Sequence, residues 1–236
     1  MSPKPSSRWI LKSFFFLISA CCLSFAFPRE LWQIYQTRLA MAFGEIQLDT
    51  EVYVFTDWQC ANCAKLDAVL KPFAPDLIKK AKLYFVDIPA PATESLTRAN
   101  ESFLLRKDKT LESYFKLRQA LFQLATATPK LSEVNVKEAL EQNNLTLEPI
   151  NDDLAKVATT VFDSLIKSLK VSQVPTIVIY NLRTHQQMKI EEMDQMKPQV
   201  IEDAIERLRQ PVKQTEEKRA EPLQENRKGT VQASAN

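Results

Sequence analysis

The stretch that decides the fold runs from Val52 to Leu70 and reads VYVFTDWQCANCAKLDAVL. Its first four residues, Val52 to Phe55, are apolar or aromatic, which is typical of a short buried strand. After the second cysteine, apolar residues recur at helical spacing, at Leu66, Val69 and Leu70. The pair Cys60-Ala61-Asn62-Cys63 therefore lies between a predicted strand and a predicted helix.

A C-x-x-C pair in this position is suited to redox chemistry. Cys60 would lie at the N-terminus of the helix, where unpaired backbone N–H groups and the helix dipole favour a thiolate. Cys63 follows one turn later on the same face, where it can attack a disulfide formed by Cys60. We interpret the pair as a dithiol redox site.

Composition sets limits on the remaining function classes. The chain has 236 residues, 45% of them hydrophobic, which is enough for one sizeable core and an additional subdomain. The formal net charge of +2 gives no strong electrostatic case for a nucleic-acid partner. The two glycines, Gly44 and Gly229, exclude glycine-rich phosphate loops and dinucleotide fingerprints, which need several glycines at close spacing.

Residues 1–26 have the pattern of an export signal. An uncharged, mostly apolar run at 13–27 follows three basic residues, Lys4, Arg8 and Lys12. Cleavage after Ala26 fits the preference for small residues, whereas a lipoprotein signal would be lipidated at Cys21. The segment could also remain as an uncleaved anchor, although about 15 residues is short for a membrane span. We expect a periplasmic protein, soluble after cleavage or tethered to a membrane by its N-terminus.

Export changes the cysteine count. Of the four cysteines, Cys21 and Cys22 lie inside the predicted signal, so only Cys60 and Cys63 remain after cleavage at Ala26. Such a protein has no other cysteine with which to build a disulfide framework. A disulfide that closes so short a loop also gains little from chain entropy. The pair is therefore better explained as redox-active than as structural.

Hydrophobic patterns predict the elements around this pair. We expect a linker or N-terminal helix at 27–45, and Pro72 should kink or end the helix that begins near Cys60. The predicted strands are 46–48, 52–55, 82–88, 176–180 and 188–190. A helical region spans about 93–170, with helices at 134–142 and 152–169 and a break at Thr128-Pro129, and its apolar stripes are interpreted as core packing. A last helix runs from 198 to about 208, and 210–236 is expected to be a disordered polar tail.

These features together resemble the thioredoxin fold in its DsbA-like form, over roughly residues 46–209. In that family the motif reads aromatic-x-x-aromatic-x-C-x-x-C-x-x-apolar, which is matched here by Phe55, Trp58, Cys60, Cys63 and Leu66. The sequence V-P-T before a strand resembles the cis-proline loop of the family, and it consists of Val174, Pro175 and Thr176. More narrowly, the chain looks like the periplasmic oxidoreductases called DsbH.

The resemblance implies an α/β fold, with a central mixed sheet flanked by helices and a helical insertion before the cis-proline strand. It implies a thiol–disulfide oxidoreductase without a cofactor, in which Cys60 attacks and Cys63 resolves. Trp58, Val174, Pro175 and Thr176 would contact substrate, and Pro175 would be cis, a form that only X-Pro bonds adopt at low cost. Taken alone, Pro175 could equally be a strand-initiating proline. The implied partners are cysteine-containing exported proteins and an electron-transfer partner in the membrane or periplasm.

Departures from the family pattern bear on the direction of the reaction. Strongly oxidising members carry histidine between the two cysteines, whereas Ala61 and Asn62 supply no positive charge, which predicts a more reducing couple. Thioredoxins also keep a buried carboxylate six residues before the first cysteine, where this chain has Val54. We expect solvated roles for the nearby acids Glu51 and Asp57. The single histidine, His185, is assigned to a surface turn.

Other uses of the C-x-x-C pair remain open. A structural zinc site needs four ligands, which two cysteines and His185 do not supply, and a c-type haem needs histidine where the chain has Ala64. No metal site is therefore expected. A Cu(I)-binding thioredoxin relative, a client-holding protein without redox turnover and a disulfide-forming oxidant are the alternative functions.

Overall fold

The centre of the fold is a four-stranded mixed sheet with the order β2-β1-β3-β4. The computed structural model describes residues 28–88, 90–128, 131–147 and 152–211. Strand β1 pairs in parallel with β2 and antiparallel with β3, and β3 pairs antiparallel with β4. The strands are β1 (Thr50–Thr56), β2 (Lys82–Asp87), β3 (Thr176–Asn181) and β4 (Gln187–Ile190).

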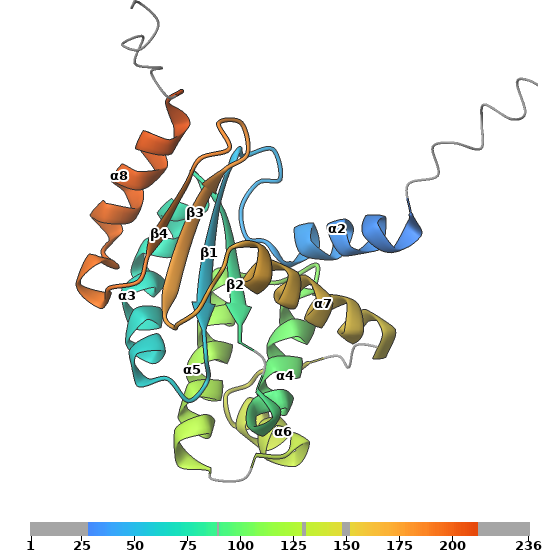
Figure 1. Cartoon of the computed structure of the whole chain (residues 1–236). Coiled ribbons are helices and arrows are strands. Elements are labelled where there is room, and N and C mark those ends of the chain that lie inside the picture. The colour runs from blue at the N-terminus through green and yellow to red at the C-terminus, as the bar shows by residue number, and fades with distance from the viewer. Residues whose placement is uncertain (1–27, 89, 129–130, 148–151, 212–236) are drawn as a thin grey trace, which may run out of the picture.

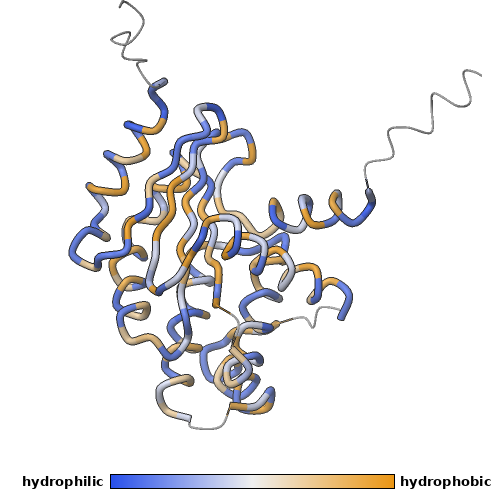
Figure 2. Tube along the Cα trace, viewed as in Figure 1, coloured by the Kyte–Doolittle hydropathy of each residue, from blue (hydrophilic) through white to orange (hydrophobic). Residues whose placement is uncertain are grey.

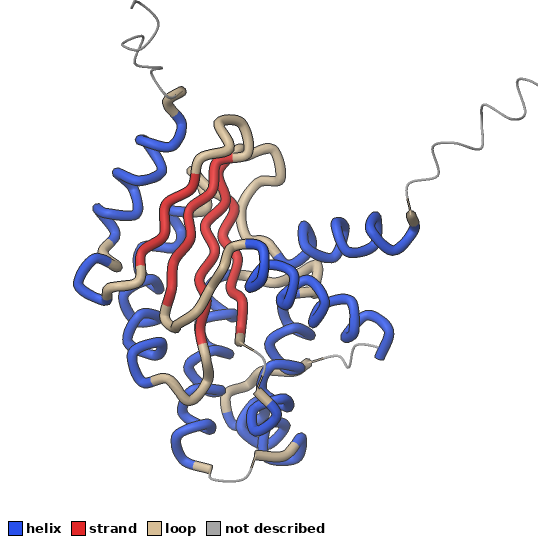
Figure 3. The backbone as a smooth tube through the Cα atoms, in the orientation of Figure 1, coloured by secondary structure: helices blue, strands red, loops and turns tan. Residues whose placement is uncertain are grey.

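Seven α-helices and two 3-10 turns surround the sheet in the described part of the chain (Figure 3). Helices α4 to α6 gather at the end of the sheet toward which the arrows of β1 and β2 point, and α8 lies along β3 and β4 (Figure 1). The helices are α2 (Arg29–Met41), α3 (Ala61–Leu77), α4 (Glu94–Leu104), α5 (Leu111–Ala127), α6 (Glu133–Gln142), α7 (Asp152–Ser168) and α8 (Pro198–Arg209), and the 3-10 turns are η1 (Pro91–Thr93) and η2 (Met193–Gln195).

Strands β1 and β2 form the middle of the core. Every residue of both strands is buried, including the polar ones at their ends. Hydrophobic residues run along the strands and recur on the helices (Figure 2), which is the pattern of a sheet covered by amphipathic helices. The end of β1 continues directly into the C-x-x-C segment, so a fully buried strand holds the base of the candidate site.

Most predicted elements are present within a residue or two of their expected bounds. One predicted strand is absent, and of the two outcomes expected at Pro72, a kink or the end of the helix, the end does not occur. Residues 46–48 form a turn and not a strand, because Phe43 instead makes the isolated bridge to β2, through Leu83. Helix α3 does not end at Pro72, and it continues past Pro75 to Leu77. The buried face of α3 keeps packing on the core through Phe73, Ala74 and Leu77, which offsets the backbone hydrogen bonds that the prolines cannot donate. The predicted signal at 1–26 and most of the predicted tail lie outside the described residues.

A buried polar network joins α2 to the sheet and corrects the expectation for Glu51. This carboxylate is buried and not solvated, and it pairs with Arg38 of α2 and with the Lys82 ammonium at 3.0 Å. The Arg38 guanidinium also donates to the Tyr53 hydroxyl at 2.6 Å. Buried charges remain stable when they are paired and hydrogen-bonded, and this network docks the N-terminal helix.

Candidate active site

The two cysteines lie at the start of α3 and form a disulfide, with their Cα atoms 5.2 Å apart. Cys60 is the N-cap residue of the helix and is half-buried, whereas Cys63 is 0% exposed. The Cys60 sulfur accepts a hydrogen bond from the Cys63 backbone N–H at 3.2 Å. Backbone N–H groups at a helix start stabilise negative charge, so this contact would favour a Cys60 thiolate in the reduced protein.

The Val174–Pro175 peptide bond is cis, and it lies at the same end of the sheet as the cysteine pair. Because β3 runs antiparallel to β1, its first residue, Thr176, is opposite Phe55, one residue before the end of β1. Val174 is half-buried and Pro175 is buried. The side chain of Thr176 faces the interior and donates to the Gln173 carbonyl at 2.8 Å, so it stabilises the loop from inside and does not face a substrate.

Trp58 also faces the interior. Its side chain is 1% exposed, its ring centroid lies 4.9 Å from that of Phe122, and its indole N–H donates to Thr97 at 3.3 Å. This burial argues against the direct substrate contact that the sequence led us to expect. Trp58 instead anchors the loop between β1 and Cys60 to the helical insertion.

The other residues that the sequence singled out fall around the pair or far from it. Asp57 is half-buried and accepts from the backbone N–H of Gln59 at 2.7 Å, which is the turn role we expected for it. Val54 is fully buried in β1, and His185 is an exposed residue of the turn between β3 and β4. Neither residue supplies a charge to the cysteines.

A buried arginine on α5 was not predicted from the sequence. Arg118 is 0% exposed and binds Asp67 of α3 through two hydrogen bonds, of 2.6 and 3.0 Å. The guanidinium also donates to the Thr56 hydroxyl at 3.0 Å and lies 5.1 Å from the ring centroid of Trp58. Thr56 and Trp58 precede the cysteine pair and Asp67 follows it by one helical turn, so Arg118 contacts both flanks of the site.

A second carboxylate, Asp87 at the end of β2, completes this group. It lies 3.5 Å from Arg118 and accepts hydrogen bonds from Asn100 at 2.8 Å and from Thr56 at 3.3 Å. Burial is the main cause that raises the pKa of Asp87 to about 7, against the opposing effect of Arg118. Burial also raises the pKa of Asp67, with Arg118 again opposing.

One signal in the sequence could have revealed this group. Arg118 lies inside the apolar run of α5, between Leu117 and Leu121, where a charged side chain must find a buried partner. Asp87 similarly ends an apolar strand. Which acid would pair with which base could not be predicted, because the partners lie on different elements of the fold.

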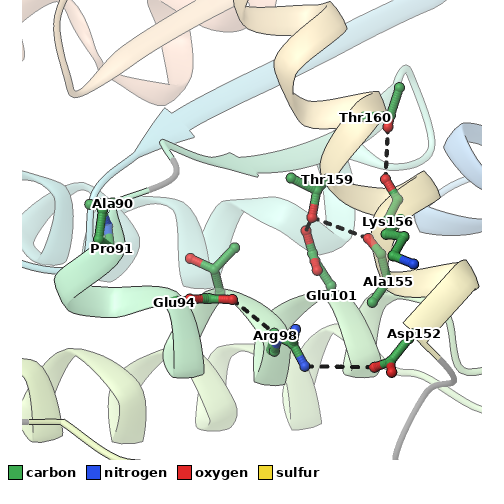
Figure 4. A pocket seen from close by; sticks show the side chains of 11 residues that line it. Ala90, Pro91, Glu94, Arg98, Glu101, Asp152, Ala155, Lys156, Thr159 and Thr160 are labelled. Atoms are coloured by element: carbon green, nitrogen blue, oxygen red, sulfur yellow. Dashed lines mark hydrogen bonds and ion pairs between the residues drawn. The ribbon is translucent and has the colours of Figure 1, made fainter.

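A cavity of about 790 Å³ lies between α4 and α7, close to the chain that leaves β2 (Figure 4). The carboxyl group of Glu101 points toward Thr159 and accepts its hydroxyl hydrogen bond at 3.2 Å. Burial is the main cause that raises the pKa of Glu101 to about 8. At the rim, Arg98 lies 3.5 Å from Glu94 and 3.9 Å from Asp152.

The described ranges hold neither a candidate metal cluster nor a candidate membrane-spanning helix. No cluster of three or more histidine, cysteine or acidic residues in this part of the chain could hold a metal ion. None of the helices described here combines the length and the apolarity needed to cross a bilayer.

Comparison with known proteins places this geometry in a family. The family model described as thioredoxin matches residues 36–196. A search of curated protein sequences gave no significant match.

The solved structures that resemble the chain share its fold at low identity. DsbA2 of Pseudomonas aeruginosa is 16% identical with a TM-score of 0.50, over 72% of this chain and 93% of that one. Alpha-DsbA1 of Wolbachia pipientis is 13% identical with a TM-score of 0.51, over 71% and 89%. A periplasmic thioredoxin-like protein of Salmonella enterica serovar Typhimurium is 15% identical with a TM-score of 0.51, over 73% and 96%.

These findings confirm the predicted fold class. The family match and the disulfide at the start of α3 together support thiol–disulfide exchange as the chemistry of the site. The family model covers well over half of the chain. The protein therefore belongs to the thioredoxin family, with a DsbA-like fold.

Proposed function

We propose that the protein exchanges disulfides with cysteine-containing substrate proteins, with Cys60 as the attacking and Cys63 as the resolving residue. The observation that carries this proposal is the unequal exposure of the pair at the start of α3, where Cys60 is half-buried and Cys63 is fully buried. A substrate sulfur can approach only the residue that has accessible surface. The helix start also favours a thiolate at Cys60, the form that attacks.

As a reductant, the dithiol form would act in two steps. The Cys60 thiolate attacks a substrate disulfide, forms a mixed disulfide and releases one substrate sulfur as a thiolate. Cys63 loses its proton and attacks the Cys60 sulfur, which forms the Cys60–Cys63 disulfide and releases the second substrate sulfur. Two electrons pass from the protein to the substrate, and an external dithiol must restore the reduced pair.

The loop at Val174 and Pro175 supplies the adjoining surface for the substrate in this proposal. The register of β1 and β3 supports it, because it brings this loop to the end of the sheet where Cys60 lies. An extended substrate segment would pair with the backbone of Val174. Trp58 and Thr176 support this surface from the interior.

We propose a reducing direction because no positive charge lies between the cysteines. Ala61 and Asn62 are both exposed and uncharged, so the thiolate gains little beyond the contribution of the helix start. Weak stabilisation of the thiolate favours the disulfide form of the protein and hence donation of electrons. A potential near −120 mV in equilibrium with glutathione, as for a strong oxidant, would contradict this direction.

We further propose that the protein is exported and acts on envelope proteins, with its own reductant in the membrane or periplasm. The basic and then apolar composition of residues 1–27 supports export. The periplasmic protein of Salmonella enterica named above has the same fold. Cell fractionation of the full chain would test this, and recovery only from the cytosol would contradict it.

The function itself is tested by trapping. Without a resolving thiol, Cys63→Ala should accumulate mixed disulfides through Cys60 when it meets oxidised substrate proteins, and reducing agent should release them. The matched control is Cys60→Ala, which keeps the buried thiol and should trap nothing. Tight Cu(I) uptake with no mixed disulfide and no reduction of insulin would favour the metal-binding alternative.

A further inference from the structure

The buried group around Arg118 has an imbalance of charge. The ion pairs among the described residues give Asp67 and Asp87 the same cation, Arg118. With both carboxylates ionised, this group carries a net charge of −1, and with one proton it is neutral. Isolated net charge is costly in the interior, so one proton belongs to the group over part of the pH range.

Geometry assigns that proton to Asp87. Asp67 is held by two short hydrogen bonds from Arg118, the arrangement that best stabilises an ionised carboxylate. Asp87 has only a 3.5 Å contact with the same guanidinium. The Asn100 carboxamide beside it has a buried oxygen with no hydrogen-bond partner among the described residues. If this amide turns over, its oxygen accepts a hydrogen bond from protonated Asp87.

The groups that face Asp87 come from four elements. Thr56 lies on β1 and Asp67 on α3, Asn100 and Glu101 lie on α4, and Tyr114 and Arg118 lie on α5. Among these, Arg118 stabilises the ionised form of Asp87 most, and the hydrogen bonds from Asn100 and Thr56 also stabilise it, whereas Asp67 opposes it. Burial raises the pKa of Asp87 to about 7, within the range that a redox measurement can cover.

We propose that Arg118, Asp67 and Asp87 form a buried cluster whose single exchangeable proton sets how readily the Cys60–Cys63 disulfide is reduced. This inference rests on the proposed function. Loss of the proton leaves a negative charge beside the helical turn that carries Cys63. Negative charge disfavours the Cys60 thiolate, so it shifts the pair toward the disulfide and makes the protein a stronger reductant as pH rises.

The test is the equilibrium with glutathione, in which two glutathione thiols reduce the protein disulfide and form one glutathione disulfide. It is measured from about pH 6 to about pH 8.5 on the wild type, Asp87→Asn and Asp67→Asn. Each single variant leaves one carboxylate for Arg118, so each removes the proton-dependent step. We expect the equilibrium constant of Asp87→Asn to equal that of the wild type near pH 6. Near pH 8.5 we expect it to be shifted roughly five- to tenfold toward the dithiol form.

The double variant, Asp67→Asn with Asp87→Asn, leaves the Arg118 charge uncompensated. We expect its equilibrium constant to lie roughly tenfold further toward the dithiol form than that of either single variant, at every pH. The matched control is Asp76→Asn, an exposed acid on α3, which should follow the wild type throughout. Glu101 is present in all five proteins, and Asp87 contributes to its raised pKa, so the loss of pH dependence must also appear in Asp67→Asn, which keeps Asp87.

The outcomes separate this inference from the proposed function. A wild type that reaches no equilibrium with glutathione through Cys60 and Cys63 would overturn the function itself. The wild type could react while the ratio of the Asp87→Asn equilibrium constant to that of the wild type stays constant across pH. This result would overturn only the cluster. If Asp87→Asn does not fold, Asp67→Asn must show the same loss of pH dependence, and its failure to do so refutes the inference.

Discussion

The sharpest stability prediction concerns Glu101, a carboxyl group that the folded protein keeps neutral. Its side chain on α4 is 1% exposed and bonds to Thr159 on α7 (Figure 4). Burial raises its pKa from 4.5 to about 8, whereas the unfolded chain returns it to the ordinary value. Between these two pH values the folded form therefore holds a proton that the unfolded form has released.

The sign and size of the effect follow from this difference. Because the folded state binds more protons, the free energy of unfolding decreases as pH rises through this window. The contribution is fully present below about pH 4.5 and is lost by about pH 8. At about 1.36 kcal/mol per pKa unit, the loss of unfolding free energy is at most about 5 kcal/mol. We expect roughly 3 kcal/mol, because solvent can enter the neighbouring cavity and partly stabilise the ionised carboxylate.

The variant Glu101→Gln should remove this pH dependence, because the amide stays neutral and its oxygen can still accept the hydrogen bond from Thr159. The free energy of unfolding is measured by urea titration of the disulfide form from about pH 5 to about pH 9. We expect similar stability at the acid end and a gain of roughly 3 kcal/mol over the wild type at the alkaline end. Glu94→Gln, an exposed acid on the same helix, is the control. An unchanged slope in Glu101→Gln would refute the reasoning.

Three further substitutions test how the site is supported, each by the free energy of unfolding. Gly44→Ala should cost about 2 kcal/mol or more, because Gly44 has φ +100° and a Cβ there would lie 2.8 Å from the Ile78 carbonyl oxygen. Glu51→Gln should cost about 3 kcal/mol, because it leaves buried Lys82 beside a neutral amide, and a cost near zero would contradict the network. Trp58→Ala should cost about 3–5 kcal/mol from the cavity it opens, and a smaller loss would mean that the loop before the cysteines collapses onto the insertion.

The strands and helices could be predicted because the spacing of apolar residues along the chain indicates which side chains are buried. Residues 52–55 and 176–180 are short apolar runs, and both became strands of the central sheet. The departures from the prediction share a physical cause, because contacts between distant parts of the chain outweighed a local preference of the sequence. Pro72 does not end α3, because the packing of a whole helical face outweighs one local preference. The expected strand at 46–48 does not form, and Phe43 makes the bridge to β2 in its place.

The chemistry of the cysteines could be predicted, but the charges around them could not. A C-x-x-C pair is local in sequence, and its position at a helix start follows from its immediate neighbours. Arg118 lies 51 residues from Asp67 along the chain, so only the folded packing of α5 on α3 brings them together. A charged residue considered alone is expected to be exposed to solvent. This expectation fails where two charged residues on different helices or strands form a buried pair.

Two parts of the protein act in opposite directions on the Cys60 thiolate. The helix start stabilises it by about 0.3–1 kcal/mol, up to about 2 kcal/mol in buried geometry, and does so at every pH. The cluster around Arg118 is neutral while Asp87 is protonated and opposes the thiolate once Asp87 ionises, by an amount of roughly the same size. Since only the second contribution titrates, the reducing tendency of the proposed enzyme should strengthen from acid to alkaline pH. The uncharged Ala61 and Asn62 leave nothing between the cysteines to mask that change.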